Sequence, residues 1–137
     1  MQRRTLAAVA LVAVVASALA ACAVASAAPA GPRTVTISIH HSRFDASTID
    51  ARAGETIRFV VRNTDPIDHE FIVGDQAVQD AHELGTEAYH PPRPGEITIP
   101  AGSTVETTFT FPNEDLLFGC HLPGHWAYGM SGIVFVR

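Results

Sequence analysis

The segment from Cys120 to Met130 constrains the fold and chemistry of this 137-residue chain more than any other stretch. It carries a thiol, two imidazoles and a thioether, from Cys120, His121, His125 and Met130. An α-helix of about 3.6 residues per turn would put Cys120 and His125 on opposing sides. Pro123-Gly124 favours a tight turn over a helix at this point. The pattern therefore predicts a loop that points Cys120, His125 and Met130 at one centre.

The donor atoms of this loop favour copper as the bound metal. Zinc sites use Cys, His and carboxylate ligands and seldom Met, whereas thiolate and thioether ligands select copper. Two His and one Cys with a weak axial Met form the blue-copper arrangement that transfers single electrons. The loop supplies one Cys, one His and the Met, so a second His must come from elsewhere.

His69 is the best candidate for this second His, because it opens an apolar, strand-like run well upstream of the loop. Taken singly, a Cys or a Met is more often a packing residue than a ligand, so the joint spacing is what favours a metal. Five other histidines compete with His69 for the place: His40, His41, His82, His90 and His121.

The pattern resembles the cupredoxins, the single-domain blue copper proteins of the plastocyanin, azurin and rusticyanin type. The resemblance rests on Cys120-x4-His125-x4-Met130, the Pro-Gly pair before the second His and a distant first His, and covers roughly Thr34 to Arg137. It implies His69, Cys120, His125 and Met130 as ligands of one type 1 copper ion. It also implies a one-electron carrier, not an enzyme, with one redox protein as donor and another as acceptor. Apolar residues would form the electron-transfer surface around the second ligand His: Leu122, Pro123, Trp126 and Tyr128.

Glu70 departs from the cupredoxin pattern, since many members carry Asn or another small polar residue after the first ligand His. That residue usually ties the two ligand segments together. We hypothesise that Glu70 instead pairs with His121, because each is adjacent to a candidate ligand.

Two other functions would use similar ligands. A copper-delivery or copper-tolerance protein would hold the ion without passing electrons, and the additional histidines would suit it. A fragment of a multicopper oxidase or nitrite reductase is the enzyme alternative, since Cys120-His121 resembles part of their His-Cys-His pairing. Gly119 stands where the first His of that pairing would be, and the chain is short for enzymes that need several domains.

Residues 1–28 have the pattern of an export signal: a basic start, an uncharged Ala/Val/Leu run and small residues. Leu19-Ala20-Ala21-Cys22 resembles the lipobox of bacterial lipoproteins, in which the Cys becomes the lipidated first residue. Small residues at 25–28 offer an ordinary cleavage site instead, and the length of the uncharged stretch also allows an uncleaved anchor. We expect export to the periplasm or the outer face of the bacterial cell membrane, with a lipid tether through Cys22 as one form.

Charge and cysteine content narrow the partners of the exported domain. Without Arg3 and Arg4, seven basic residues, all Arg, stand against 14 acidic ones. Nucleic acid calls for a basic face, so this balance argues against it as a partner. Cys120 is the single thiol left in an oxidising compartment, where a bound metal would protect it. We expect the domain to be a monomer.

Residues 34–137 show the pattern of an all-β domain. Six segments are β-branched, aromatic or alternating and are bounded by turn residues: 34–39, 55–62, 70–73, 96–99, 104–111 and 132–136. Short strands at near-regular intervals predict a Greek-key antiparallel β-sandwich, a fold that brings distant strand ends together.

Residues 76–84 interrupt the strand rhythm. Their apolar residues recur at helical spacing and predict a short amphipathic helix: Ala77, Val78, Ala81 and Leu84. The Pro-rich segment that follows is expected to be extended. This insertion carries His82 and His90 together with Glu83 and Glu87. Two alternatives stay open for these side chains, a second metal site or solvated loop histidines.

Overall fold

The computed structural model describes residues 31–87 and 89–137. The predicted export signal and its lipobox Cys22 lie outside these residues. The described chain forms these elements: β1 (Arg33–Ile39), β2 (Thr48–Ala51), β3 (Thr56–Asn63), β4 (His69–Gly74), α1 (Gln76–Glu83), β5 (Glu96–Ile99), β6 (Thr104–Thr110), β7 (Leu116–Gly119) and β8 (Ser131–Val136). Among the described residues, no helix is long and apolar enough to cross a membrane.

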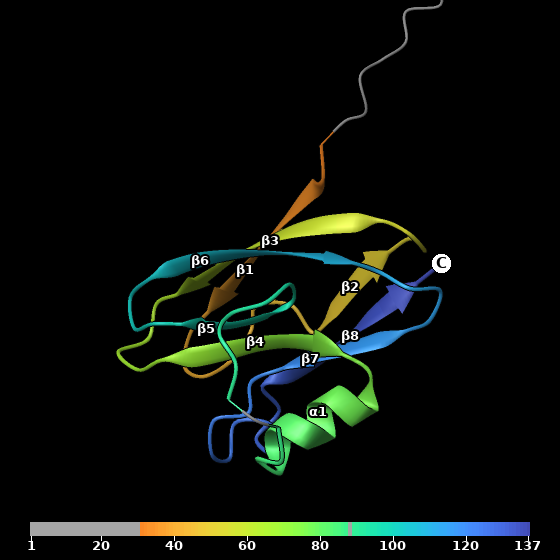
Figure 1. Cartoon of the computed structure of the whole chain (residues 1–137). Coiled ribbons are helices and arrows are strands. Elements are labelled where there is room, and N and C mark those ends of the chain that lie inside the picture. The colour runs from red at the N-terminus through yellow and green to blue at the C-terminus, as the bar shows by residue number, and fades with distance from the viewer. Residues whose placement is uncertain (1–30, 88) are drawn as a thin grey trace, which may run out of the picture.

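Two sheets stack into a sandwich, one with the order β1-β3-β6 and the other with the order β2-β8-β7-β4-β5 (Figure 1). The predicted all-β sandwich is confirmed. The sheets are mixed, however, and not wholly antiparallel as predicted, because β1 runs parallel to β3 and β2 runs parallel to β8. Hairpins impose antiparallel pairing, and neither of these two edge strands is joined to its partner by a hairpin.

Alternation along the strands places one face of each sheet in the core. In β3, Ile57, Phe59 and Val61 are fully buried, while Arg58 between them faces solvent. Phe59 meets Phe71 of the opposite sheet with ring centroids 5.1 Å apart. Burying an aromatic or branched side chain of this size contributes about 1.5–3 kcal/mol, so these contacts hold the two sheets together.

The six predicted strand segments correspond to β1, β3, β4, β5, β6 and β8, and no end differs by more than one residue. The prediction missed β2 and β7, which have only four residues each. The helix is confirmed: α1 begins after Asp75, whose carboxylate accepts a hydrogen bond from the Val78 N–H at 2.9 Å and so caps the first turn.

The predicted apolar face of α1 is only partly buried: Val78 and Ala81 are half-buried, whereas Ala77 and Leu84 are exposed. Leu84 is 74% exposed, and the residue that α1 buries is Gln79, at 1% exposure. The Gln79 side-chain amide donates to the carbonyl oxygens of Ile72, Gly74 and Leu117 at 3.2–3.4 Å. The helix therefore docks on β4 and β7 through a polar side chain whose hydrogen bonds are satisfied.

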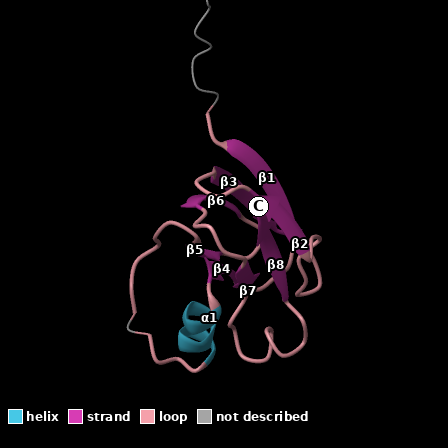
Figure 2. Ribbon diagram, turned by 90° about the vertical axis from the view of Figure 1, so that its right-hand side faces the viewer, coloured by secondary structure: helices cyan, strands magenta, loops and turns pink. Residues whose placement is uncertain are grey.

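Strand β1 runs from one end of the sandwich to the other. Its first residue, Arg33, pairs with Ile57, and its last residue, Ile39, pairs with Asn63 at the far end of β3. The described chain thus begins at the end opposite α1 and the loop between β7 and β8 (Figure 1). Figure 2 shows α1 and that loop side by side at their shared end.

Candidate metal centre

Three of the four predicted ligands converge at the end of the sandwich. His69 opens β4, Cys120 follows β7, and His125 lies in the loop between β7 and β8. The Cys120 Sγ lies 3.9 Å from His69 Nδ1 and 3.4 Å from His125 Nδ1, and all three donor atoms lie within 4.8 Å of one another. Three ligands at bond lengths near 2.1 Å around one ion stand about 3.6 Å apart. The spacing of these donors therefore fits a single metal ion.

The ligand loop is closed by its own backbone. Gly124 adopts a left-handed conformation (φ 85°) inside the turn that closes when the His125 N–H donates to the Leu122 carbonyl at 2.9 Å. The Met130 N–H donates to the His125 carbonyl at 2.9 Å, and the Cys120 N–H donates to the Met130 carbonyl at 3.1 Å. Met130 is fully buried, so the loop returns it to the Cys120 side of the centre. Its role as the fourth ligand stays a prediction.

Asp65 sets the orientation of His69. Its Oδ2 lies 2.9 Å from His69 Nε2, which assigns the proton to Nε2 and leaves Nδ1 facing Cys120. The backbone N–H groups of His41 and Ser42 each donate to the Asp65 carboxylate at 2.7 Å. Burial alone would raise the pKa of Asp65, but these hydrogen bonds and the one to His69 outweigh it and hold that pKa below its usual range.

The sequence analysis gave no role to Asp65. A signal was present, because a carboxylate four residues before a ligand His is a suitable partner for its other ring nitrogen. Asn63 holds Asp65 in turn, since its side-chain oxygen accepts the Asp65 N–H at 2.9 Å while its amide donates to the Ile67 and Ile99 carbonyls. The position of His69 is thus fixed by Asp65, which is held in turn by Asn63.

The electrostatics of the centre fit a cation. Cys120 is fully buried, and this burial raises the pKa of its thiol, although the Glu70 N–H at 3.3 Å from Sγ acts in the opposite direction. Burial also lowers the pKa of His125, which keeps its imidazole neutral and able to coordinate. A buried thiolate needs a nearby positive charge, and a metal ion supplies one when the proton leaves.

Glu70 links β4 to the ligand loop, as its predicted pairing with His121 requires. The contact is made by the backbone of His121, whose N–H donates to Glu70 Oε2 at 3.2 Å. The His121 imidazole instead lies 2.9 Å from Glu83 Oε2 and 2.7 Å from Gln79 Oε1. His121 therefore joins the ligand loop to α1 and leaves the metal centre to its neighbour Cys120.

The remaining histidines stay outside the centre. Among the described residues, the cluster around Cys120 contains only His69 and His125. His40 lies behind it, 3.9 Å from Asp65 Oδ1, and His41 stacks on His40. The predicted electron-transfer surface lies around His125 and is partly accessible: Leu122 and Trp126 are half-buried, whereas Pro123 and Tyr128 are exposed.

Comparison with known proteins identifies the family of the chain. Residues 33–137 match the family described as copper binding proteins, plastocyanin/azurin family. The chain belongs to this copper-binding family. Its cofactor is copper, and the donor set of His69, Cys120 and His125 agrees with that cofactor.

Two relatives are copper-resistant cuproproteins named CopI. The CopI of Rubrivivax gelatinosus is 38% identical over an alignment of 110 positions. This alignment covers 77% of this chain and 67% of the relative. The CopI of Pseudomonas aeruginosa is 28% identical over an alignment of 139 positions, gaps included. This alignment covers 77% of this chain and 76% of the relative. Among solved structures, auracyanin A, a blue copper protein of Chloroflexus aurantiacus, superimposes with a TM-score of 0.60 at 26% identity and covers 78% of this chain and 100% of its own. The fold is that of the cupredoxins.

Proposed function

We propose that this protein is an extracytoplasmic type 1 copper protein that transfers single electrons, and that this redox activity serves copper tolerance. The observation that carries the proposal is the convergence of His69, Cys120 and His125 on one point. His69, Cys120 and Met130 are fully buried there, whereas His125 is only half-buried. In this assignment His69, Cys120 and His125 are the strong ligands, and Met130 is the weak axial one.

Electron transfer suits a site whose ligands do not move. Copper bound here would cycle between Cu(I) and Cu(II), and a scaffold that holds both forms in one geometry lowers the cost of each transfer. His69 is fixed by Asp65, and the Cys120 sulfur accepts the Glu70 N–H. The half-buried ring of His125 offers electrons a short path to the surface.

The proposed role in copper tolerance rests on the relatives, whose names describe them as copper-resistant. A copper-delivery protein is the second candidate function, and those names fit it as well. The full burial of Cys120, His69 and Met130 favours a resident ion over one that is handed on. In our proposal the protein is not an enzyme, and its partners are a redox protein that donates electrons and another that accepts them.

Export rests on the signal pattern of residues 1–28, with a lipid tether through Cys22 as one form. The excess of acidic over basic residues would steer the domain toward a basic surface on a redox partner. We propose that the domain acts as a monomer.

The experiment that separates the two functions measures copper retention and electron transfer on the same protein. We expect a reversible one-electron couple in voltammetry, and copper that stays bound during hours of dialysis against a mild chelator. We also expect the gene to restore copper resistance to a bacterium whose own CopI has been deleted, and the Cys120→Ser variant to fail. Resistance restored by a protein without a reversible couple, from which copper passes readily to an acceptor, would favour delivery instead.

A further inference from the structure

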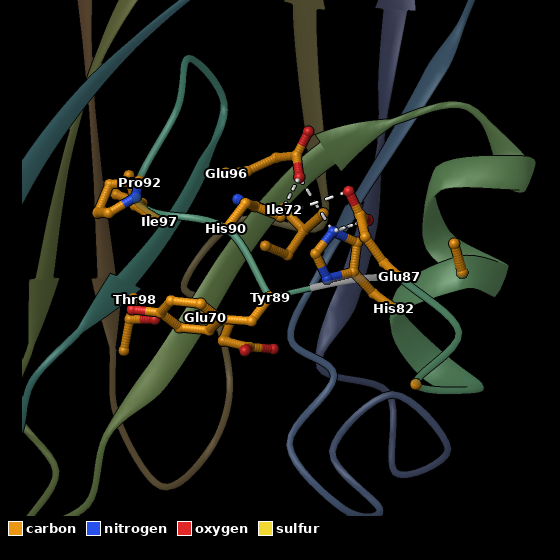
Figure 3. A pocket seen from close by; sticks show the side chains of 12 residues that line it. Glu70, Ile72, His82, Glu87, Tyr89, His90, Pro92, Glu96, Ile97 and Thr98 are labelled. Carbon is orange, nitrogen blue, oxygen red and sulfur yellow. Dashed lines mark hydrogen bonds and ion pairs between the residues drawn. The ribbon is translucent and has the colours of Figure 1, made fainter.

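A second group of metal-binding side chains lies beside α1, apart from the copper centre. His82 comes from α1, Glu87 and His90 from the segment after it, and Glu96 opens β5. Each offers one ligand atom, and these four atoms lie within 4.8 Å of one another. The four side chains point toward one another in the lining of a pocket of about 420 Å³ (Figure 3). We call these four residues the histidine–glutamate cluster.

The Nε2 atom of each histidine lies close to both carboxylates of the cluster. His82 Nε2 lies 2.9 Å from Glu87 Oε2 and 3.0 Å from Glu96 Oε2. His90 Nε2 lies 3.5 Å from Glu87 Oε1 and 3.3 Å from the same Glu96 Oε2. The four side chains are 11–22% exposed, so they are neither the solvated loop histidines of the sequence alternative nor closed off from solvent.

The tautomer of His90 is the one that a metal ligand requires. Its Nδ1 lies 2.9 Å from the Pro91 carbonyl oxygen, an acceptor that needs an N–H opposite it. With Nδ1 protonated, His90 turns Nε2 toward two carboxylates, and either a proton on Nε2 or a metal ion between them would remove the repulsion of the lone pairs. Ligand histidines commonly donate their other ring N–H to a backbone carbonyl in this way.

Arg93 supplies the positive charge that the cluster has without a metal ion. Its Nη2 lies 2.7 Å from Glu96 Oε2 and also contacts Glu87 Oε1. One guanidinium against two carboxylates leaves a net negative charge. The Arg93 side chain is 44% exposed, so it has room to turn toward solvent when another cation enters.

We propose that the histidine–glutamate cluster binds a second metal ion, a divalent ion of borderline softness, Cu²⁺ or Zn²⁺. Two imidazoles and two carboxylates suit these ions, and the lack of a thiolate or thioether disfavours Cu(I). The Irving–Williams order gives Cu²⁺ the higher affinity at such a site. This site goes beyond the proposed function, because it needs none of the residues of the copper centre.

The test uses the protein with one copper ion already in its first centre. Zn²⁺ is added in a calorimeter and, separately, Cu²⁺ is added and followed by electron paramagnetic resonance. We expect each metal to bind as one further equivalent, and the second copper to show the wide hyperfine splitting of a nitrogen and oxygen site. The double variant His82→Gln/His90→Gln should weaken this binding by more than about tenfold. Glu114→Gln, which removes an exposed carboxylate outside both metal groups, should bind as the parent does.

Arg93→Gln distinguishes a metal site from an ion-pair cluster. Removing the competing cation should tighten Zn²⁺ binding several-fold, whereas a purely structural ion pair predicts no binding and a lower unfolding midpoint. The absorption of the first copper centre checks that each variant is folded, and the single variant His90→Gln replaces the double one where folding fails. The Zn²⁺ titration is repeated on Cys120→Ser, so that failure of the first centre is not mistaken for failure of the second. No further equivalent of either metal, or one that persists in the histidine variants, would overturn the proposal.

Discussion

The copper centre and the histidine–glutamate cluster are two groups of metal-binding side chains built by opposite means. The copper centre combines two histidines with the short side chain of Cys120, in a frame of backbone hydrogen bonds and Asp65, and two of its three converging donors are fully buried. The cluster uses longer, half-buried side chains, and its members are held by charge against one another and against Arg93. The first geometry therefore does not depend on an ion, whereas the second is set by the balance of charge.

The two groups meet at His121. Its backbone N–H binds Glu70 next to the copper centre, and its ring stacks on His82 of the cluster with centroids 5.7 Å apart. The ring also stacks on Trp126 of the ligand loop, with centroids 4.9 Å apart. The comparison can be tested by changing one group and measuring the other.

Cys120→Ser should have the largest effect. We expect complete loss of the intense thiolate-to-copper absorption and of the reversible couple, because no other sulfur donor of the same strength lies in the centre. Zn²⁺ binding at the cluster should be unchanged if the two groups are independent. Visible spectroscopy and calorimetry on one preparation measure both, and a variant that keeps the absorption would show that another residue supplies the strong ligand.

Asp65→Asn should weaken copper binding by roughly ten- to hundred-fold, because the variant no longer fixes the tautomer and orientation of His69. Competition with a chelator of known affinity measures the change. Asp68→Asn is the matched control, since Asp68 is an exposed carboxylate that accepts from the Ala101 N–H and does not touch His69. Equal affinities in the two variants would mean that Asp65 has no special role in the centre.

Gln79→Ala should lower the free energy of unfolding by about 2–3 kcal/mol, because buried carbonyl groups of β4 and β7 lose their donor. The same change frees the His121 ring, so the properties of both metal groups should shift. Urea denaturation gives the first effect. Gln76→Ala on the exposed face of α1, where the side chain bonds only to Asp80, should cost less than about 1 kcal/mol. A similar loss in both variants would contradict the docking role of Gln79.

Glu55→Gln should have the smallest effect on the free energy of unfolding. It shows how much a single exposed ion pair contributes, for comparison with the buried groups. The Glu55 carboxylate bonds to Arg33 at 2.7 Å, and this bond holds its pKa below the usual range. A carboxylate with a lowered pKa stabilises the folded state above the unfolded pKa, and this contribution disappears as the pH falls through the folded pKa. At neutral pH we expect a loss of less than about 1 kcal/mol, which should vanish in acid. A difference that persists below pH 3 would exclude the ion pair as its cause.

Spacing along the chain predicted the parts of the molecule that depend on neighbours in sequence. The donors of the ligand loop lie within eleven residues around Pro123-Gly124, so one turn brings Cys120 and His125 together. Long strands with clear alternation, such as β3, were predicted for the same reason. The four residues of β7 neither alternate nor include a β-branched residue, as those of β5 do, so that only pairing with β4 and β8 makes them a strand.

Among the buried polar residues, Gln79 was out of reach because its partners come from other elements of the fold. Gln79 is buried only because the carbonyl groups of two strands surround it, and the predicted apolar face of α1 missed this. In the insertion, Glu83 was grouped with the cluster histidines. It bonds to His121 instead, while Glu96, assigned from sequence to a strand, faces His82.

Strand β1 separates the start of the described chain from the copper centre. The described chain begins at Gly31, and the seven residues of β1, from Arg33, carry it about 20 Å to the end where Asp65 holds His69. If lipid anchors Cys22, the domain would be attached through the end opposite the copper centre. The predicted electron-transfer surface around His125 would then lie on the side away from that attachment point, where it would be open to diffusing partners.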